Sequence, residues 1–231
     1  MGNLKIEKTL RKLCLEAVTF SETGNNREKW TRLYHAKIGD SGWSIGRVQF
    51  DISKNRQGRE MLMDCGVTPQ DIKFLNNLPR DDEQLLPVIA RVNSIMSTPL
   101  AFRIMDEASQ AYIDKGLYRI NDLAGIGHLE LRTLDLLFLL DYHTQFHISV
   151  EGTCHDWLET LQHFSIHQFM EFKKTLPWYA KPEGVRDTQR RFDCVMKFAQ
   201  ERRIEEYRGD EGIKTYKTPD DFDPCPDWLR E

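Results

Sequence analysis

Apolar residues recur at three- and four-residue spacing from residue 3 to residue 21, and this spacing predicts an amphipathic helix. The turn Gly24-Asn25-Asn26 then predicts the end of that helix. Residues 28–37 fit either a short helix or an extended segment. Residues 38–53 differ because β-formers are spaced between glycines, which is typical of a hairpin or a small sheet.

The chain after residue 53 is predicted to be helical almost throughout. Thr98-Pro99 supplies a capping hydroxyl and a proline at the first helical position, whereas Gly116 predicts a helix end. Residues 129–146 are the most apolar segment, so we expect them at the centre of the protein. The predicted helices cover residues 58–65, 69–77, 83–97, 99–115, 129–146, 155–163, 165–175 and 185–206.

This order of elements predicts an α+β fold that is predominantly helical. We expect a single domain over residues 1–231. Within it, residues 1–60 hold the first helix and the small β element, and residues 61–207 form a helical lobe. Residues 208–231 are rich in Asp, Pro and Gly and are predicted to form an irregular tail.

Composition narrows the class of protein and its partners. A chain with 40% hydrophobic and 29% charged residues is ordinary for a soluble globular protein. Its formal net charge of −4 gives no attraction to nucleic acid or to an anionic membrane, so we expect neither as a partner. Five scattered cysteines without a CxxC pair are typical of a protein with structural, reduced thiols.

The N-terminal sequence MGNLKIEKTLRKLCLEAV has no basic flank followed by an apolar run, so no secretory signal is predicted. The most apolar stretch, 134-LDLLFLLDY-142, is too short to span a bilayer. We therefore expect synthesis in the cytoplasm without a signal peptide.

Two carboxylates are the main candidates for chemistry. Glu22 comes at the end of the first predicted helix, and Asp40 follows in a Gly-rich turn. Cleavage of a glycosidic bond requires an acid that holds its proton near neutral pH, which a partly desolvated glutamate at a helix end can do. An inverting enzyme also needs an ionised base, a role that suits an exposed turn aspartate. The alternative is structural: Glu22 on a fraying helix end and Asp40 as a turn former.

The segment from Glu22 to Gly46 resembles the active-site region of the lysozyme-like superfamily. Glu22, Trp30, Tyr34 and 38-IGD-40 occur in the order found in bacterial chitosanases, although the interval from Tyr34 to Asp40 is shorter here. The stretch 40-DSGWSIG-46 is similar to the hairpin of phage-type lysozymes, with Ser44 in the place of a threonine.

Other stretches extend the resemblance or depart from it. The stretch 184-GVRDTQRRF-192 resembles a helix start of phage-type lysozymes, and 106-DEASQAYIDKG-116 resembles the second lobe of chitosanases. Thr23 and the lack of an Arg-Gly pair after Asp40 depart from the chitosanase pattern.

The resemblance implies a two-lobed lysozyme-like fold with a substrate cleft between the lobes. It implies inverting hydrolysis, with Glu22 as the general acid, Asp40 as the general base and Ser44 positioning the water. The two carboxyl groups should then lie roughly 6.5–9.5 Å apart. No metal and no organic cofactor is expected. The predicted substrate-binding residues are Trp30, Tyr34, Trp43, Gln49 and Asp51.

The expected substrate is a β-1,4-linked amino-sugar polymer, with peptidoglycan favoured. A muramidase without a signal peptide fits a phage endolysin, or a delivered antibacterial toxin whose partner is an immunity protein. It would act on the cell wall after release or delivery, as a monomer. The alternatives are a chitosanase, a non-catalytic lysozyme-like module that binds a glycan, and a helical interaction protein without a glycan role.

Two further constellations have alternative interpretations. Asp51 could replace Asp40 as the base, contact the substrate or cap the following segment. The HxxxH pairs His143/His147 and His163/His167 would each lie on one helix face and could hold zinc if a third ligand such as Asp141 or His155 joined them. Their Phe, Tyr and Leu neighbours favour packing or surface histidines instead.

Overall fold

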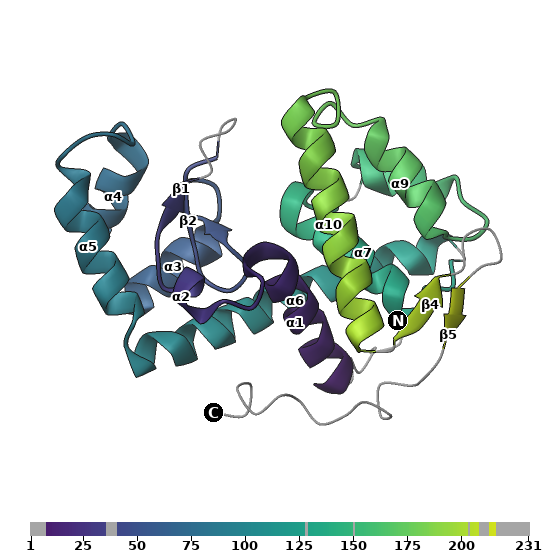
Figure 1. Ribbon diagram of the computed structural model, residues 1–231, viewed down its shortest axis with the longest axis horizontal. Helices are drawn as coiled ribbons and strands as arrows, with labels where there is room; N and C mark the ends of the chain where they lie inside the picture. The colour runs from purple at the N-terminus through teal and green to yellow at the C-terminus, as the bar shows by residue number, and fades with distance from the viewer. Residues whose placement is uncertain are drawn as a thin grey trace. The chain divides into compact units, whose positions relative to one another are not determined.

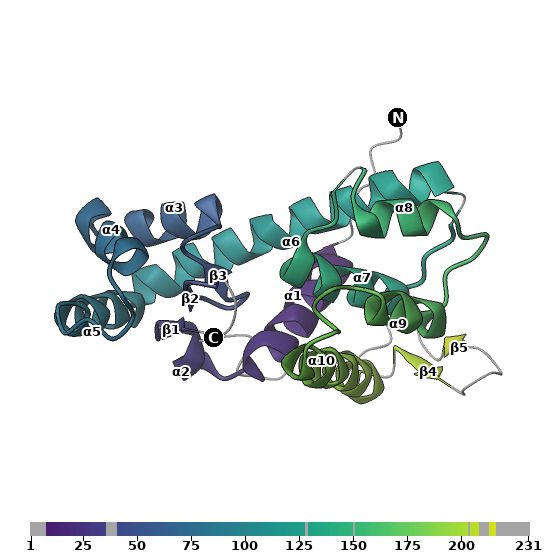
Figure 2. The same ribbon diagram turned by 90° about the horizontal axis from the view of Figure 1, so that it is seen from above.

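The computed structural model describes residues 8–35, 41–127, 129–149, 151–202, 204–207 and 213–215 (Figures 1 and 2). These residues are mostly helical, with a small three-stranded antiparallel sheet, so the predicted α+β class with many helices is confirmed. The elements in chain order are α1 (Lys8–Thr23), α2 (Arg27–Trp30), β1 (Tyr34–His35), β2 (Trp43–Ile45), β3 (Phe50–Asp51), α3 (Arg56–Asp64), α4 (Pro69–Asn77), α5 (Leu85–Met96), α6 (Pro99–Gly127), α7 (Thr133–Phe146), α8 (Thr153–Glu159), α9 (Ile166–Lys174), α10 (Pro182–Glu201), β4 (Glu205–Tyr207) and β5 (Ile213–Thr215).

The chain divides into two compact units. We call residues Glu22–Ile113 the sheet unit, and Met1–Ser21 together with Asp114–Glu231 the helical unit. The divisions fall inside α1 and inside α6, so neither coincides with the division near residue 60 that was expected from the sequence.

In the sheet unit, the strands lie in the order β1-β2-β3 and pair antiparallel. Local signals fix the helices that follow. The Asn55 side chain caps α3, and the Thr68 side chain caps α4 ahead of a proline in its first turn. At the start of α6, the Thr98 hydroxyl accepts a hydrogen bond from the Ala101 N–H at 3.2 Å, as the Thr98-Pro99 step predicts.

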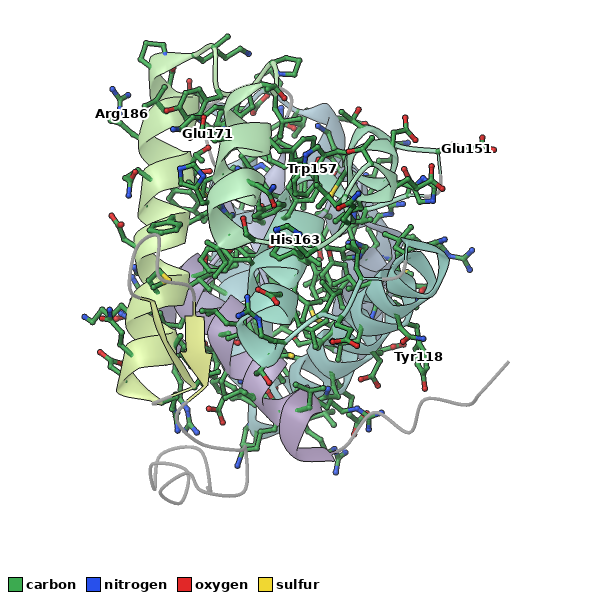
Figure 3. All side chains as sticks on the ribbon, turned by 90° about the vertical axis from the view of Figure 1, so that its right-hand side faces the viewer. Tyr118, Glu151, Trp157, His163, Glu171 and Arg186 are labelled. Atoms are coloured by element: carbon green, nitrogen blue, oxygen red, sulfur yellow. The ribbon has the colours of Figure 1, made fainter. Side chains whose placement is uncertain are left out.

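In the helical unit, α7 is buried along most of its length, and α10 packs against it. An aromatic cluster fills the space beside α7, where the Trp157 ring stacks on Phe172 with centroids 4.6 Å apart (Figure 3). The predicted helix end at Gly116 is wrong, because α6 continues to Gly127. A Cβ atom at Gly116 would lie 2.8 Å from Leu140 Cδ2, so this glycine allows close packing of α6 on α7.

Two other predictions need correction in the last part of the chain. Helix α10 ends at Glu201, and Glu205–Tyr207 instead forms strand β4. The region after residue 208 was predicted to be irregular, but its residues Ile213–Thr215 pair antiparallel with β4. Within the described part of the chain, no single helix is long and apolar enough to cross a membrane; Leu85–Met96 and Pro99–Asn121, bent by 85°, meet that test only as a pair.

Candidate functional site

The two predicted catalytic acids differ in how far they can be described. Glu22 lies one residue before the end of α1 and is half-buried. Asp40, together with Ile38 and Gly39, lies outside the described residues. The expected separation of the two carboxyl groups therefore stays a prediction.

The turn after Glu22 is held by Thr23 and Trp30. The chain reverses through Gly24 and Asn25, which have φ values of 64° and 58°. The Trp30 indole N–H donates to the Thr23 hydroxyl at 2.9 Å, and its ring has the Arg47 guanidinium 4.9 Å from the centroid. Trp30 was predicted to contact substrate, but it is only 3% exposed, and its contacts anchor the turn.

The register of the small sheet brings three predicted site residues onto one face. Ser44 pairs with Tyr34 on one side and with Asp51 on the other. Residues directly opposite each other in an antiparallel sheet have their side chains on the same face. Tyr34, Ser44 and Asp51 therefore form one row across the sheet, which we call the Tyr34–Ser44–Asp51 row.

The opposite face of the sheet is apolar. Trp43, Ile45 and Phe50 are buried, and the Trp43 ring contacts His35 edge-on with centroids 5.2 Å apart. Trp43 was predicted to contact substrate, but its burial gives it a packing role. By contrast, Tyr34 is 61% exposed and keeps its ring available to a ligand.

Asp51 organises the loop at the end of the row. Its Oδ2 accepts from the Gly42 N–H at 3.2 Å, and its Oδ1 accepts from the Ser53 N–H at 2.9 Å and the Ser53 hydroxyl at 2.5 Å. A Cβ atom at Gly42 would lie 2.8 Å from Ser53 Oγ, so only glycine fits without a shift. Of the roles proposed for Asp51, the structure matches a local structural one best.

In the turn between β2 and β3, Gln49 donates hydrogen bonds to the backbone of the same turn. Gly46 has φ 92°, and its carbonyl accepts from the Gln49 side-chain amide at 2.8 Å and from the Gln49 N–H at 3.2 Å. Arg47, which sequence analysis missed, is buried and forms an ion pair with Asp106 at 2.8 Å. The Asp106 carboxylate in this pair is exposed, and the sequence signal for the pair is that Arg47 stands within a β-rich motif.

In the helical unit, a buried ionic cluster holds Ser21, the residue directly before Glu22. The Ser21 hydroxyl donates to Asp141 Oδ1 at 2.6 Å, and Arg190 Nη1 donates to the Ser21 carbonyl at 2.7 Å. Arg191 Nη1 donates to the same Asp141 oxygen at 2.9 Å. This cluster fixes the backbone at the position where α1 leads into Glu22.

Opposite charges in the cluster shift one another's pKa. Burial alone would raise the pKa of Asp141, but Arg191, Lys173 and the Ser21 hydrogen bond outweigh it, and the pKa is lowered. Burial lowers the pKa of Lys173, and Asp141 opposes that effect. Arg190 and Arg191 also pair with Asp187, so these arginines form an internal salt-bridge network.

The two histidine pairs differ: the His143 and His147 rings lie edge-on with centroids 5.5 Å apart, whereas the start of α9 separates His163 from His167. Helix α7 ends at Phe146, and His147 follows with φ 56°. The His143 Nδ1 accepts from the Ile148 N–H at 3.1 Å, and burial, followed by His147 and Arg119, lowers the pKa of His143 to about 4. His163 precedes α9, which begins at Ile166, so His163 and His167 do not share a helix face.

No protein-family model matches the chain, and neither a curated protein nor a solved structure does. The functional conclusion therefore depends on the motif around Glu22 and on the geometry described above.

Proposed function

We propose that the protein is a lysozyme-like glycoside hydrolase that cleaves β-1,4 bonds of an amino-sugar polymer by an inverting mechanism. The observation that carries the proposal is the Tyr34–Ser44–Asp51 row, which follows α1, the helix that bears Glu22, after the short helix α2. A helix bearing an acid, then a small antiparallel sheet, then many helices is the order of elements that a two-lobed lysozyme-like fold requires.

In this mechanism, Glu22 protonates the leaving oxygen and Asp40 activates the attacking water. The anchored Ser21 supports the acid role of its neighbour, because a general acid must be held in reach of the bond that it protonates. Ser44, in the middle of the row, would hold the water beside Asp40. Asp51 already accepts three hydrogen bonds from Gly42 and Ser53, which favours Asp40 over Asp51 as the base.

Substrate contact is assigned to the exposed aromatic ring rather than to the buried ones. Tyr34 would stack on a sugar ring at the end of the row. Trp30, Trp43 and Gln49 would support the turn and strand from behind, through the contacts described above.

The polymer that we propose is peptidoglycan, so the enzyme would be a muramidase. It would act on the cell wall after release, as an endolysin does, or after delivery as an antibacterial toxin that is countered by an immunity protein. Soluble chitosan is the alternative substrate, and the test below includes it.

The test measures turbidity loss of purified, outer-membrane-stripped Gram-negative cell walls and, in parallel, reducing ends released from soluble chitosan. Wild type is compared with Glu22→Gln and Asp40→Asn, and with Glu28→Gln as a matched control on the exposed face of α2. We expect both active-site variants to lose activity by a factor of about 10²–10⁴, since this is the usual contribution of a general acid or base. The control should retain wild-type activity.

Each outcome has a distinct meaning, provided that circular dichroism shows the variants folded. If wild type clears the walls and both variants do not, the result supports a muramidase. If NMR shows α-configured products released from β-configured bonds, the result supports inversion. If only chitosan is cleaved, the catalytic roles of Glu22 and Asp40 would stand, and the substrate would be chitosan instead of peptidoglycan. Activity on neither polymer, or variants equal to wild type, would refute the enzyme and leave a non-catalytic module.

A further inference from the structure

Helix α8, in the helical unit, gathers three metal-ligating side chains away from the proposed active-site residues. His155, Asp156 and Glu159 each offer a ligand atom, and these atoms all lie within 4.8 Å of one another. At 3.6 residues per turn, positions 155, 156 and 159 fall within about 100° of the helix circumference. The three side chains therefore converge on one side of a single element.

The imidazole of His155 is the observation that points to a ligand. The residue is only 5% exposed, and its Nε2 atom is buried without a hydrogen-bond partner. This atom lies 3.6 Å from Glu159 Oε1, and Nδ1 of the same ring lies 3.5 Å from Asp156 Oδ1. A buried polar atom without a partner is costly and needs an explanation.

Both ion-pair contacts of the histidine with its acids are long. Charge-assisted hydrogen bonds between nitrogen and a carboxylate are usually about 2.7–2.9 Å long. Two ligands at about 2.0–2.1 Å from a tetrahedral zinc ion are, by contrast, about 3.3–3.4 Å apart. The separation of 3.6 Å between Nε2 and Oε1 is closer to the edge of such a tetrahedron than to a hydrogen bond.

The inner face of α8 is packed against neighbouring residues, which fixes the position of the helix. Cys154 and Leu158 are buried, and Trp157, which is labelled in Figure 3, stacks on Phe172 of α9. The carboxylates of Asp156 and Glu159 are exposed, so an ion could reach them from solvent. A ligand set built on a packed helix needs only small rotations of two exposed side chains to close around an ion.

We propose that His155, Asp156 and Glu159 bind a divalent cation of the zinc class, with water at the remaining position. An imidazole and two carboxylates suit zinc, and three protein ligands leave one coordination position open. The site contains none of the residues assigned to glycan cleavage, so its existence does not depend on the proposed function.

The test titrates zinc into the full-length chain after removal of metal with a chelator, using isothermal titration calorimetry. We expect the titration to show one zinc ion per chain. In thermal unfolding, Tm should rise by several degrees at zinc concentrations about a hundredfold above Kd. Glu159→Gln and Asp156→Asn, which change only exposed groups, should each raise Kd at least tenfold. The double variant His163→Gln/His167→Gln removes the exposed histidine pair and should bind as wild type does.

Cobalt substitution identifies the ligand type. We expect visible d–d bands of a nitrogen and oxygen site, and a thiolate charge-transfer band would place the ion on the cysteines and overturn the proposal. Absence of binding, a Kd unchanged by Glu159→Gln, or loss of binding in the double histidine variant would also overturn it. None of these readouts involves glycan cleavage, so they separate this proposal from the proposed activity.

Discussion

Asp51 in the sheet unit and Asp141 in the helical unit are both bound by serine, but their surroundings are opposite. Asp51 is half-buried and accepts hydrogen bonds from backbone and hydroxyl groups of its own loop. Asp141 is 2% exposed and meets Ser21 and Arg191, residues that are distant in the sequence. The sheet unit thus keeps its polar row near solvent, whereas the helical unit uses buried charge to fix the backbone.

Asp141→Asn should have the largest effect, because it removes a buried charge. It removes one of the two carboxylates that compensate the buried charges of Arg191 and Lys173, which should cost about 3–5 kcal/mol in free energy of unfolding. Urea denaturation measures the unfolding free energy of this variant and of the control Glu171→Gln, which removes an exposed ion pair with Lys174. The control should change stability little; equal losses in both variants would contradict a special role for buried charge.

The stability of the helical unit should depend on pH through the buried His143. The pKa of His143 is lowered to about 4 in the folded chain, whereas its ordinary value is about 6.5. Between these two pH values, the unfolded chain therefore binds a proton at this residue and the folded chain does not. Stability should therefore fall as pH drops from 6.5 to 4, by about 3 kcal/mol from this group. His143→Gln retains an acceptor for the Ile148 N–H and should flatten this part of the profile. Thermal unfolding across that range checks the slope, and parallel profiles of the two proteins would refute it.

Asp51→Asn repeats the aspartate substitution in the open setting of the sheet unit. It weakens the hydrogen bonds from Gly42 and Ser53 but strands no buried charge, so we expect a loss of about 1 kcal/mol in unfolding free energy. Urea denaturation of Asp51→Asn and Asp141→Asn in parallel gives the ratio of their losses in unfolding free energy. A loss as large as that of Asp141→Asn would mean that exposure does not separate the two sites.

Tyr34→Ala is the smallest expected change and tests the open end of the row. The exposed ring should contribute little to stability, so Tm should shift by less than about 2 °C. If the ring stacks on sugar, KM for the polymer should rise about fivefold, which corresponds to about 1 kcal/mol of aromatic contact. Tyr34→Phe keeps the ring and serves as the control; an unchanged KM in Tyr34→Ala would remove Tyr34 from the substrate contacts.

Local signals were enough to predict many elements. Helix α4 spans Pro69–Asn77, the same residues that its pattern predicts, because Thr68 caps it and proline opens it. Gly116 misled because a glycine can end a helix or allow another helix to approach, and the choice depends on Leu140, which is distant in the sequence. Propensity within a window carries no information about such a partner.

The candidate site was predictable only in part for the same reason. The pattern of glycines and β-formers predicted a small sheet, but the row of Tyr34, Ser44 and Asp51 depends on a register that only the folded strands define. Trp30 and Trp43 were expected to contact sugar because aromatic residues serve both in binding and in packing. The anchoring of Ser21 by Asp141 spans 120 positions, and no local motif announces it.

The division of the chain at Ser21 and Asp114 has a consequence for synthesis on the ribosome. The sheet unit is one continuous segment, so it can fold as soon as residues up to Ile113 have emerged. Ser21 must wait longer for its partners, because its hydroxyl bonds to Asp141 and its carbonyl bonds to Arg190. Nascent chains should therefore gain protection from proteases over residues 22–113 first, and at Ser21 only when the last long helix has left the exit tunnel.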